Sequence, residues 1–347
     1  MNHTQLPLSE RIQLTAQPVI PTGFDDLTWR SLEHADLPAL LVLQNLCNAV
    51  DSPESVTTLD ELEESFATPS FDAKLDSLIA FDTEGRAVAH AESFMDDEAE
   101  TLVNVYLNGC VHPERRREGI GRALLAWQEA RGLQQLAASP LTLPGWLNTH
   151  AEADASAPLA LLKGAGYLPT RWWLSMQRVL GDDLPVRSLA EGVRFEPYSA
   201  EWSEPARIAM NDAFRDHWGS QPASKDEWES GERLESFKPE LSTVAVVTLD
   251  DGSEQVAGVL TVEISEEEWQ ANGFSFGYIS GLGVLRDWRG KGIAQGLLTR
   301  ALAQLKAAGL ERAVLDVDSD SPTGANGLYE HLGFREKSRS LSLTKQF

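Results

Sequence analysis

Residues 282–294 have the sequence LGVLRDWRGKGIA, in which a strand pattern leads through a basic, glycine-containing loop into a helix pattern. A loop that ends at a helix N-terminus presents unpaired backbone amides and the positive end of the helix dipole, so it binds an anion well. Gly290 and Gly292 let the main chain come close to such a ligand. Arg289 and Lys291 add positive charge beside it. The stretch therefore predicts an anion site.

A weaker copy of this loop, VHPERRREGIG, occupies residues 111–121. Hydrophobic periodicity around the two copies predicts the same element order in each half of the chain. In the first half we expect strands at 27–32, 78–81, 87–91, 102–111, 141–147 and 171–179, and helices at 36–50, 58–66, 119–131 and 158–163. In the second half we expect strands at 193–198, 243–248, 256–264, 274–284, 313–317 and 334–344, and helices at 203–214, 224–237, 293–308 and 323–331.

This element order predicts an α/β fold in which helices flank a mostly antiparallel sheet, rather than a doubly wound fold. We expect an N-terminal arm over residues 1–22 and a first domain over 23–180. A short linker, 181–190, then leads to a second domain over 191–347. Thr58 is a predicted helix N-cap, and Glu61 three residues later completes a capping box.

Composition excludes several classes of protein. The formal net charge of −24 argues against binding to nucleic acid, which needs a basic face, and favours a positively charged substrate. No run of residues is apolar enough to span a membrane, and the first residues do not form a signal peptide. Two cysteines and seven histidines without ligand spacing predict neither a disulfide scaffold nor a metal site. We therefore expect a cytoplasmic protein, either a monomer or a homodimer.

The two loops match the signature Arg/Gln-x-x-Gly-x-Gly/Ala, once at residues 116–121 and once at 289–294. With the repeated element order, the chain resembles the GNAT superfamily of N-acetyltransferases, as a tandem member arranged like the mycothiol synthases. The resemblance implies two mixed sheets in which the fourth and fifth strands splay apart at a bulge. It also implies acetyl-CoA as co-substrate, with its pyrophosphate on the loop amides and its pantetheine arm along the open strand edge.

The resemblance implies a set of residues for binding acetyl-CoA. In the second half, Leu282 and Val284 would bond the pantetheine through their main chains, and the Val284 amide would help to stabilise the oxyanion. The expected set in this half is Leu282, Gly283, Val284, Arg289, Gly290, Lys291, Gly292, Ile293, Ala294 and Asn326. In the first half it is Arg116, Gly119 and Gly121.

The chemistry needs an acid for the departing thiolate and a base for the attacking amine. The segment NGLYEHLGF, residues 326–334, is similar to the family's Asn-x-x-Tyr-x-x-x-Gly-Phe pattern. This likeness implies that Tyr329 is the acid. The alternative is that its ring only packs the helix against the sheet. Glu263 is the candidate base, and a solvated surface acid is the alternative. Asp216 and His217 are expected to line the acceptor pocket.

The two halves differ at the catalytic positions. Leu162 stands where the second half has Tyr329, so the first half lacks the expected acid. Glu118 stands at the position of Lys291 and places a negative charge near the expected pyrophosphate. We therefore expect a degenerate first domain, with cofactor binding there left open. Cys110 is expected to be a buried, inert thiol, because no histidine is placed beside it by sequence spacing.

The sequence thus predicts an acetyl-CoA-dependent N-acetyltransferase that acts on a primary amine of a small molecule, by direct attack in a ternary complex. A non-enzymatic acyl-CoA-binding or regulatory protein and a mycothiol synthase-like enzyme are the alternatives. The identity of the acceptor amine is left open by the sequence.

Overall fold

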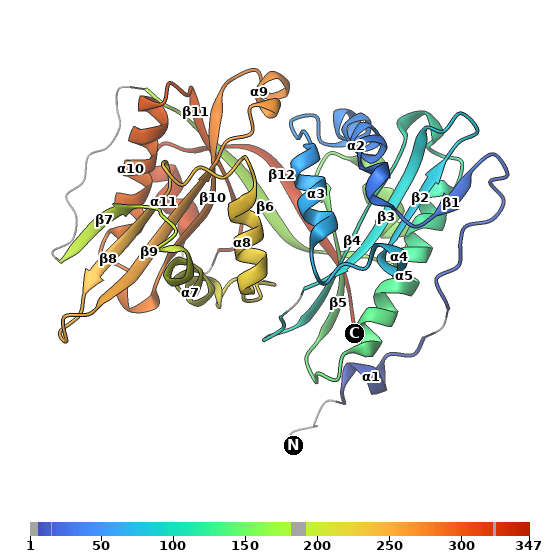
Figure 1. Cartoon of the computed structure of the whole chain (residues 1–347), viewed down its shortest axis with the longest axis horizontal. Helices are drawn as coiled ribbons and strands as arrows, with labels where there is room; N and C mark the ends of the chain where they lie inside the picture. The colour runs from blue at the N-terminus through green and yellow to red at the C-terminus, as the bar shows by residue number, and fades with distance from the viewer. Residues whose placement is uncertain (1–5, 15, 97, 182–191, 322–323) are drawn as a thin grey trace. The chain divides into compact units, whose positions relative to one another are not determined.

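The computed structural model describes residues 6–14, 16–96, 98–181, 192–321 and 324–347 (Figure 1). The chain forms two compact units. Unit 1 contains Met1–Arg171 together with Ser340–Phe347, and unit 2 contains Trp172–Arg339. Each unit has its own hydrophobic core.

Unit 1 has the strand order β1-β2-β3-β4-β5-β12, with β4 and β5 parallel and the other pairs antiparallel. Its strands are β1 (Thr28–Arg30), β2 (Ser77–Phe81), β3 (Ala87–Met95), β4 (Val103–Val111), β5 (Gly145–Glu152) and the part of β12 (Arg335–Gln346) from Ser340 onward. Its helices are α1 (Leu8–Arg11), α2 (Leu37–Asp51), α3 (Leu59–Ala67), α4 (Ala73–Asp76), α5 (Ile120–Ala138) and α6 (Ser156–Gly164), with 3-10 turns at His34–Asp36 and Pro113–Arg115.

Unit 2 has the strand order β6-β11-β10-β9-β8-β7, with β10 and β11 parallel and the other pairs antiparallel. Its strands are the part of β6 (Leu168–Val179) from Trp172 onward, β7 (Val193–Pro197), β8 (Thr243–Thr248), β9 (Glu254–Glu263), β10 (Phe276–Val284) and β11 (Arg312–Asp318). Its helices are α7 (Ser203–Phe214), α8 (Lys225–Arg233), α9 (Glu267–Asn272), α10 (Ile293–Ala307) and α11 (Ala325–His331), with a 3-10 turn at Arg286–Trp288. The predicted α/β class with mostly antiparallel sheets is confirmed.

The two units exchange their closing strands, and here the structure differs from the predicted domains 23–180 and 191–347. β6 comes from the first half of the sequence but pairs with β11 over seven residue pairs in unit 2. The end of β12 comes from the second half but pairs with β5 in unit 1. Periodicity identifies a strand without identifying its partner. The partner follows from packing, since Met176 of β6 is buried in the core of unit 2.

The predicted arm is partly a packed element. Leu8 of α1 is fully buried in the core of unit 1, and its amide donates to the carbonyl of Leu141 at 2.9 Å. A β-carbon at Gly145 would lie only 2.7 Å from the Leu8 side chain, so β5 and α1 are in close contact. Leu8 and Ile12 of the arm therefore belong to the core of unit 1. Most of the predicted linker, 182–190, lies outside the described residues.

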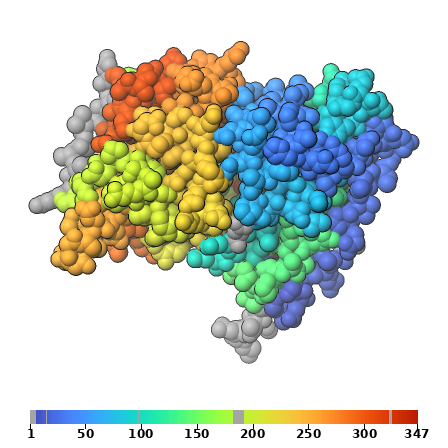
Figure 2. All heavy atoms as spheres, viewed as in Figure 1, coloured from blue at the N-terminus to red at the C-terminus, as the bar shows by residue number. Residues whose placement is uncertain are grey.

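In unit 2 the sheet is covered on both faces. Helix α10 packs on one face with Leu297 and Leu298, which are fully buried. Helix α7 packs on the opposite face, where Ala206 and Ala209 meet strands β8 and β9. Figure 2 shows α7 and α8, in yellow-green and yellow, over part of the visible surface of this unit. The functional cavity described below opens between these two layers.

The predicted capping signal at Thr58 is confirmed. Thr58 caps α3, and the Thr58 and Glu61 side chains each bond the other's backbone amide, so the predicted capping box is present.

Within the described residues no helix is long and apolar enough to cross a membrane. The same part of the chain brings no three metal-ligating side chains together.

Candidate active site

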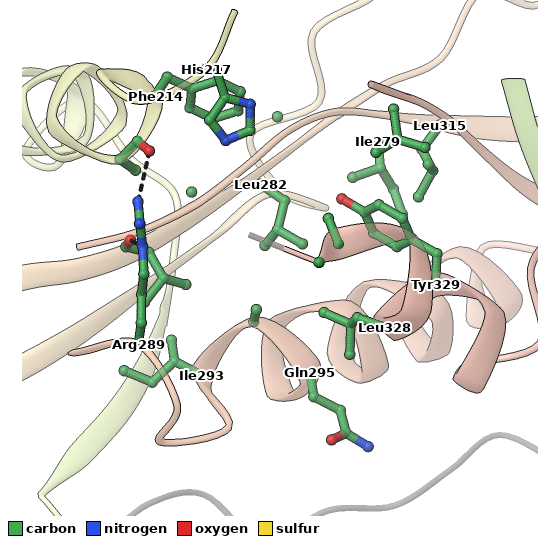
Figure 3. Close-up of a pocket in the computed structure, with 18 of the residues that line it drawn as sticks. Phe214, His217, Ile279, Leu282, Arg289, Ile293, Gln295, Leu315, Leu328 and Tyr329 are labelled. Carbon is green, nitrogen blue, oxygen red and sulfur yellow. Dashed lines mark hydrogen bonds between the residues drawn. The ribbon is translucent and has the colours of Figure 1, made fainter. Parts of the chain in front are cut away.

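Strands β10 and β11 separate in the middle of the sheet of unit 2. Their parallel pairing covers three residue pairs and ends at Tyr278 and Val314. On the other side of β10, the register with β9 shifts between Ile279 and Gly281, which marks a β-bulge at this point. Beyond the bulge, β10 and β11 leave a cavity of about 380 Å³ between them. Figure 3 shows side chains from both strands pointing into it.

The cavity draws its lining from five parts of unit 2: β10, the basic loop with the start of α10, β11 with α11, the end of α7, and β6. Its lining residues are Trp173, Ala213, Phe214, His217, Ile279, Ser280, Gly281, Leu282, Gly283, Val284, Trp288, Arg289, Gly290, Gly292, Ile293, Ala294, Gln295, Leu315, Asp316, Val317, Asp318, Gly324, Ala325, Leu328 and Tyr329. Most of the residues predicted for acetyl-CoA are therefore brought together at one place.

Two glycines allow α7 to lie close to the distorted strand. A β-carbon at Gly283 would be 2.6 Å from the sulfur of Met210, and one at Gly281 would be 2.8 Å from the terminal methyl carbon of the same side chain. Real side chains do not make such short contacts, so a larger residue at either position would displace the Met210 side chain. The edge of β10 at Leu282 thus stays open to the cavity, while α7 packs against one face of this strand.

The basic loop forms one end of the cavity. Gly290 and Gly292 both have left-handed backbone conformations, with φ of 75° and 80°. Gly292 is the N-cap of α10, whose first amides have no acceptor within the helix and point toward the loop. An anionic group at this end of the cavity would meet these amides and the positive end of a 15-residue helix. The loop has the geometry of the predicted anion site.

Arg289 braces the loop. Its Nε donates to the carbonyl of Val284 at 3.2 Å, and its Nη2 donates to the carbonyl of Ala213 at 2.9 Å (Figure 3). The guanidinium therefore ties the end of β10 to α7. Lys291 lies outside the cavity lining, with its Nζ 3.9 Å from the centre of the Trp288 ring. Of the two predicted cationic residues, Arg289 therefore holds the loop in position, and Lys291 does not line the cavity.

Tyr329 projects into the cavity from α11, and its phenol oxygen lies between Leu282 and Ile279 in Figure 3. The side chain is 93% inaccessible to solvent, and its ring packs against Phe334 with centroids 5.8 Å apart. Burial raises the pKa of Tyr329 to about 12, because a phenolate loses its hydration there. The phenol therefore keeps its proton at neutral pH and can donate it inside the cavity.

The remaining predicted residues lie around this centre. His217 lines the cavity, with its ring 4.5 Å from that of Phe214. Asp216 lies outside the lining and forms an ion pair with Arg286, which lowers the pKa of the Asp216 carboxyl. Arg289 lies 3.6 Å from the same carboxylate.

Asn326 and Glu263 also lie outside the lining. The Asn326 amide donates to the carbonyls of Asp318 and Ser319, at 3.2 and 2.9 Å, and so holds the turn after β11. Glu263 ends β9, where it pairs in register with Tyr278 just before the bulge. Both residues therefore border the site without lining the cavity.

Two acidic residues of β11 and one tryptophan were not predicted. Asp316 lines the cavity and accepts a hydrogen bond of 3.1 Å from the Tyr278 hydroxyl. Asp318, two residues further along β11, also lines the cavity. Trp173 reaches the cavity because β6 pairs with β11, and its ring meets that of Trp218 edge-on at 6.4 Å. Trp173 was not predicted as a site residue, since the exchange of β6 was not predicted.

In the corresponding loop of unit 1 the arginine is engaged by the protein itself. Arg116 forms a two-point ion pair with Asp51 at 2.6 and 2.8 Å and also donates to the carbonyl of Val111. A methyl group at Gly121 would make ordinary contacts with Leu161 at 3.5 Å and Val111 at 3.7 Å, and one at Gly119 would meet no atom within 4 Å. Gly119 keeps the left-handed N-cap conformation, with φ of 95°.

Arg117 stands at the position of Gly290 and has the same left-handed backbone, with φ of 66°. A residue with a β-carbon is strained in this conformation. We expect Arg117→Gly to stabilise unit 1 by about 1 kcal/mol, raising its Tm by about 2–4 °C in a thermal melt. Arg117→Ala keeps the β-carbon and removes the charge, so its Tm should not change. Equal gains in both variants would mean that charge repulsion, and not backbone strain, was relieved.

Comparison with known proteins agrees with this geometry. Residues 206–334 match the model of the Acetyltransferase (GNAT) family. A mycothiol acetyltransferase of Salinispora arenicola is 30% identical over 249 residues, which are 71% of this chain and 73% of that protein. The chain belongs to the GNAT acetyltransferase family. The family resemblance expected from the sequence is thereby confirmed.

Solved structures place both halves of this acetyltransferase in the same fold. A GCN5-related N-acetyltransferase from Sphaerobacter thermophilus superposes with a TM-score of 0.67 and 25% identity, covering 94% of this chain and 97% of that one. A tandem GNAT protein from the clavulanic acid biosynthesis pathway has a TM-score of 0.65 at 18% identity, over 92% and 98% of the two chains. The protein is thus a tandem GNAT N-acetyltransferase, an enzyme class that uses an acyl-CoA donor.

Proposed function

We propose that unit 2 transfers the acetyl group of acetyl-CoA to a primary amine of a small molecule, by direct attack in a ternary complex. The observation that carries this proposal is the protonated phenol of Tyr329 in the cavity between the splayed strands. The same cavity ends at the amides of the basic loop. A thioester bound along β10 would therefore have a proton donor near its sulfur and an anion site at its far end.

Acetyl-CoA supplies the reactive thioester, and the residues of unit 2 hold it. The loop amides from Gly290 to Ala294 are proposed to bind the pyrophosphate, while Leu282 and Val284 bond the pantetheine through their main chains. The Val284 amide is proposed to bind the oxyanion. Asn326 acts on this site by holding the turn after β11.

Proton transfer involves two sides of the cavity. Tyr329 is proposed to donate its proton to the departing thiolate. On the acceptor side, the carboxylate of Asp316, which lines the cavity but is exposed to solvent, attracts the ammonium form of the amine because the two charges are opposite. Glu263, which precedes the bulge on β9, remains our proposed base, and it would act through a water molecule. His217 and Asp216 are proposed to shape the acceptor pocket.

A second candidate is the activity for which the relatives are named, mycothiol acetylation. Its support is the likeness to a mycothiol acetyltransferase of Geodermatophilus obscurus, 28% identical over 87% of this chain and 92% of that protein. This candidate uses the same site and the same chemistry, and it differs only in the acceptor. The proposal also places the enzyme in the cytoplasm, as a monomer or homodimer, with a first unit that does not turn over.

The test is a thiol-release assay with acetyl-CoA and a panel of primary amines, including aminoglycosides, polyamines, amino sugars and the amine precursor of mycothiol. We expect release above the hydrolysis background with at least one amine. Calorimetry with acetyl-CoA is expected to show one site per chain. Binding without turnover of any amine would instead support the non-enzymatic acyl-CoA-binding alternative.

A matched pair of loop variants locates the donor site. Gly292→Ala adds a β-carbon at φ 80°, which costs about 1 kcal/mol and shifts the first amides of α10. We expect the Kd for acetyl-CoA to rise about tenfold in calorimetry. Gly119→Ala makes the same change in unit 1, at φ 95°, and should lower the Tm without changing Kd. A weaker Kd in Gly119→Ala would place acetyl-CoA in unit 1.

A further inference from the structure

Asp316 and Trp173 lie on the same face of the sheet of unit 2, and both line the cavity. In the antiparallel register of β6 and β11, Trp173 is opposite Asp318 and Ser175 is opposite Asp316. Paired residues point to one face of a sheet, and so do residues two apart along a strand. Trp173 and Asp316 are therefore diagonal neighbours, with β-carbons roughly 7 Å apart, a distance that a large ring spans.

The Asp316 carboxylate carries a charge that the protein does not neutralise. It accepts a hydrogen bond of 3.1 Å from the hydroxyl of Tyr278. Burial and the charge of Asp316 raise the pKa of Tyr278 well above its usual range, so this phenol stays neutral. Among the residues that the structure describes, no lysine or arginine pairs with Asp316, whereas Asp216 nearby in the sequence of the site is paired with Arg286. The exposed carboxylate of Asp316 is thus open to a cation from solution.

Aromatic rings stand on the same side of the cavity. Trp173 meets Trp218 edge-on, with ring centroids 6.4 Å apart. Phe214 and His217 line the cavity from the end of α7 and the turn after it. The face of a tryptophan ring attracts a cation. A carboxylate beside such a ring therefore suits an alkylammonium group, whose charge meets the carboxylate while its methylene groups cover the ring.

Asp316 attracts a protonated amine, but the reacting nitrogen cannot remain its partner during transfer. That nitrogen must lose its proton before it attacks the thioester, because an ammonium has no free electron pair. An ion pair with a carboxylate favours the protonated form and raises the pKa of the amine. A second cationic group that does not react keeps its charge throughout the transfer. It is the better partner for Asp316.

We propose that Asp316 and Trp173 form a subsite for a second cation, and that the acceptor is a small diamine. One nitrogen, deprotonated through water by Glu263, forms the amide bond as the C–S bond of acetyl-CoA breaks, and the thiolate takes a proton from Tyr329. The other nitrogen stays an ammonium between the carboxylate and the indole ring. The formal net charge of −24 favours the approach of such a dication. This inference rests on the proposed acetyl transfer and names its acceptor class.

The experiment compares diaminobutane and diaminopentane with butylamine and pentylamine in the thiol-release assay. We expect kcat/KM to be about tenfold higher for each diamine than for the monoamine of the same length, which an exposed ion pair and a cation–π contact together supply. In Asp316→Asn and in Trp173→Leu this ratio should fall toward about two, the factor that two equivalent nitrogens give. Because every enzyme is tested with the same amines, their intrinsic reactivities cancel from the change in ratio.

Two further variants control for indirect effects. Trp172→Leu changes the preceding residue of β6, whose side chain lies on the other face of the strand and is 42% exposed. It should keep the wild-type ratio. Asp316→Glu restores the charge at this position and should recover most of the preference that Asp316→Asn loses. Because Asp316 is exposed, both of its variants should melt at the wild-type Tm.

The outcomes separate the subsite from the transfer reaction. A diamine preference of about two in the wild type, or a tenfold preference that survives in Asp316→Asn, would overturn the subsite and leave acetyl transfer standing. Thiol release with none of the four amines would count against transfer to simple amines. Calorimetry then decides on the subsite, which requires a Kd for diaminobutane about tenfold lower than that for butylamine in the wild type and similar values in Asp316→Asn.

Discussion

Tyr329→Phe is expected to lower kcat for acetyl transfer by about 100-fold, because it removes the proton donor for the departing thiolate. The ring keeps its place against Phe334, so the Kd for acetyl-CoA should stay within about twofold of the wild-type value. Steady-state kinetics and calorimetry measure the two quantities separately. An unchanged kcat would show that Tyr329 only packs α11 against the sheet.

Tyr167→Phe is the matched control for that variant. Tyr167 is a buried tyrosine of unit 1, and it follows Gly166 at the end of α6 as Phe334 follows Gly333 at the end of α11. The change removes the same hydroxyl from a tyrosine outside the cavity. We expect kcat to stay at the wild-type value, so a loss seen only in Tyr329→Phe reports chemistry rather than packing.

The pH dependence of the wild-type enzyme follows from the same pKa. The protonated phenol is the active form, and a pKa of about 12 keeps it fully populated at every pH below about 11. The free acceptor amine gains reactivity as its ammonium, with pKa near ~10, loses a proton. We therefore expect kcat/KM to rise with pH and to show no falling limb below pH ~11 that belongs to Tyr329. A falling limb near pH 8–9 would argue for a different acid.

Much of the site was predictable because its signals are local. The loop required glycine at Gly290 and Gly292, whose left-handed conformations exclude most residues. The bulge that the family resemblance implied is present in β10, between Ile279 and Gly281. Helix α7 has the predicted bounds, Ser203–Phe214. Periodicity, capping and turn chemistry act over a few residues and are therefore visible in the sequence.

The unpredicted parts depend on long-range packing. Trp173 reaches the cavity only because β11 accepts β6 as its neighbour. In unit 1, the ion pair of Arg116 with Asp51 depends on the packing of α2 on β4, and it engages a cation that the motif alone assigns to a phosphate. Such contacts between distant segments leave no periodic trace in one sequence.

The exchange of β6 and the end of β12 between the two units also predicts which fragment of the chain can fold by itself. A chain of residues 192–347 contains the whole predicted second domain except its first residue but lacks β6. It would leave the edge of β11 unpaired along Arg312–Asp318 and would lose the buried Met176 from the core. Together these losses approach the whole stability of a domain, about 5–15 kcal/mol. We expect this chain to be insoluble or to melt without a cooperative transition.

A chain of residues 168–339 is the matched control, because it keeps β6 and omits the segment of β12 that completes unit 1. All seven pairs of β6 with β11 and the Trp173 wall of the cavity are retained. We expect a cooperative thermal transition and acetyl-CoA binding close to that of the full chain, measured by calorimetry and calorimetric melting. Should residues 192–347 instead fold and bind as well as residues 168–339, β6 would be dispensable, and the predicted boundary near residue 190 would describe the functional domain after all.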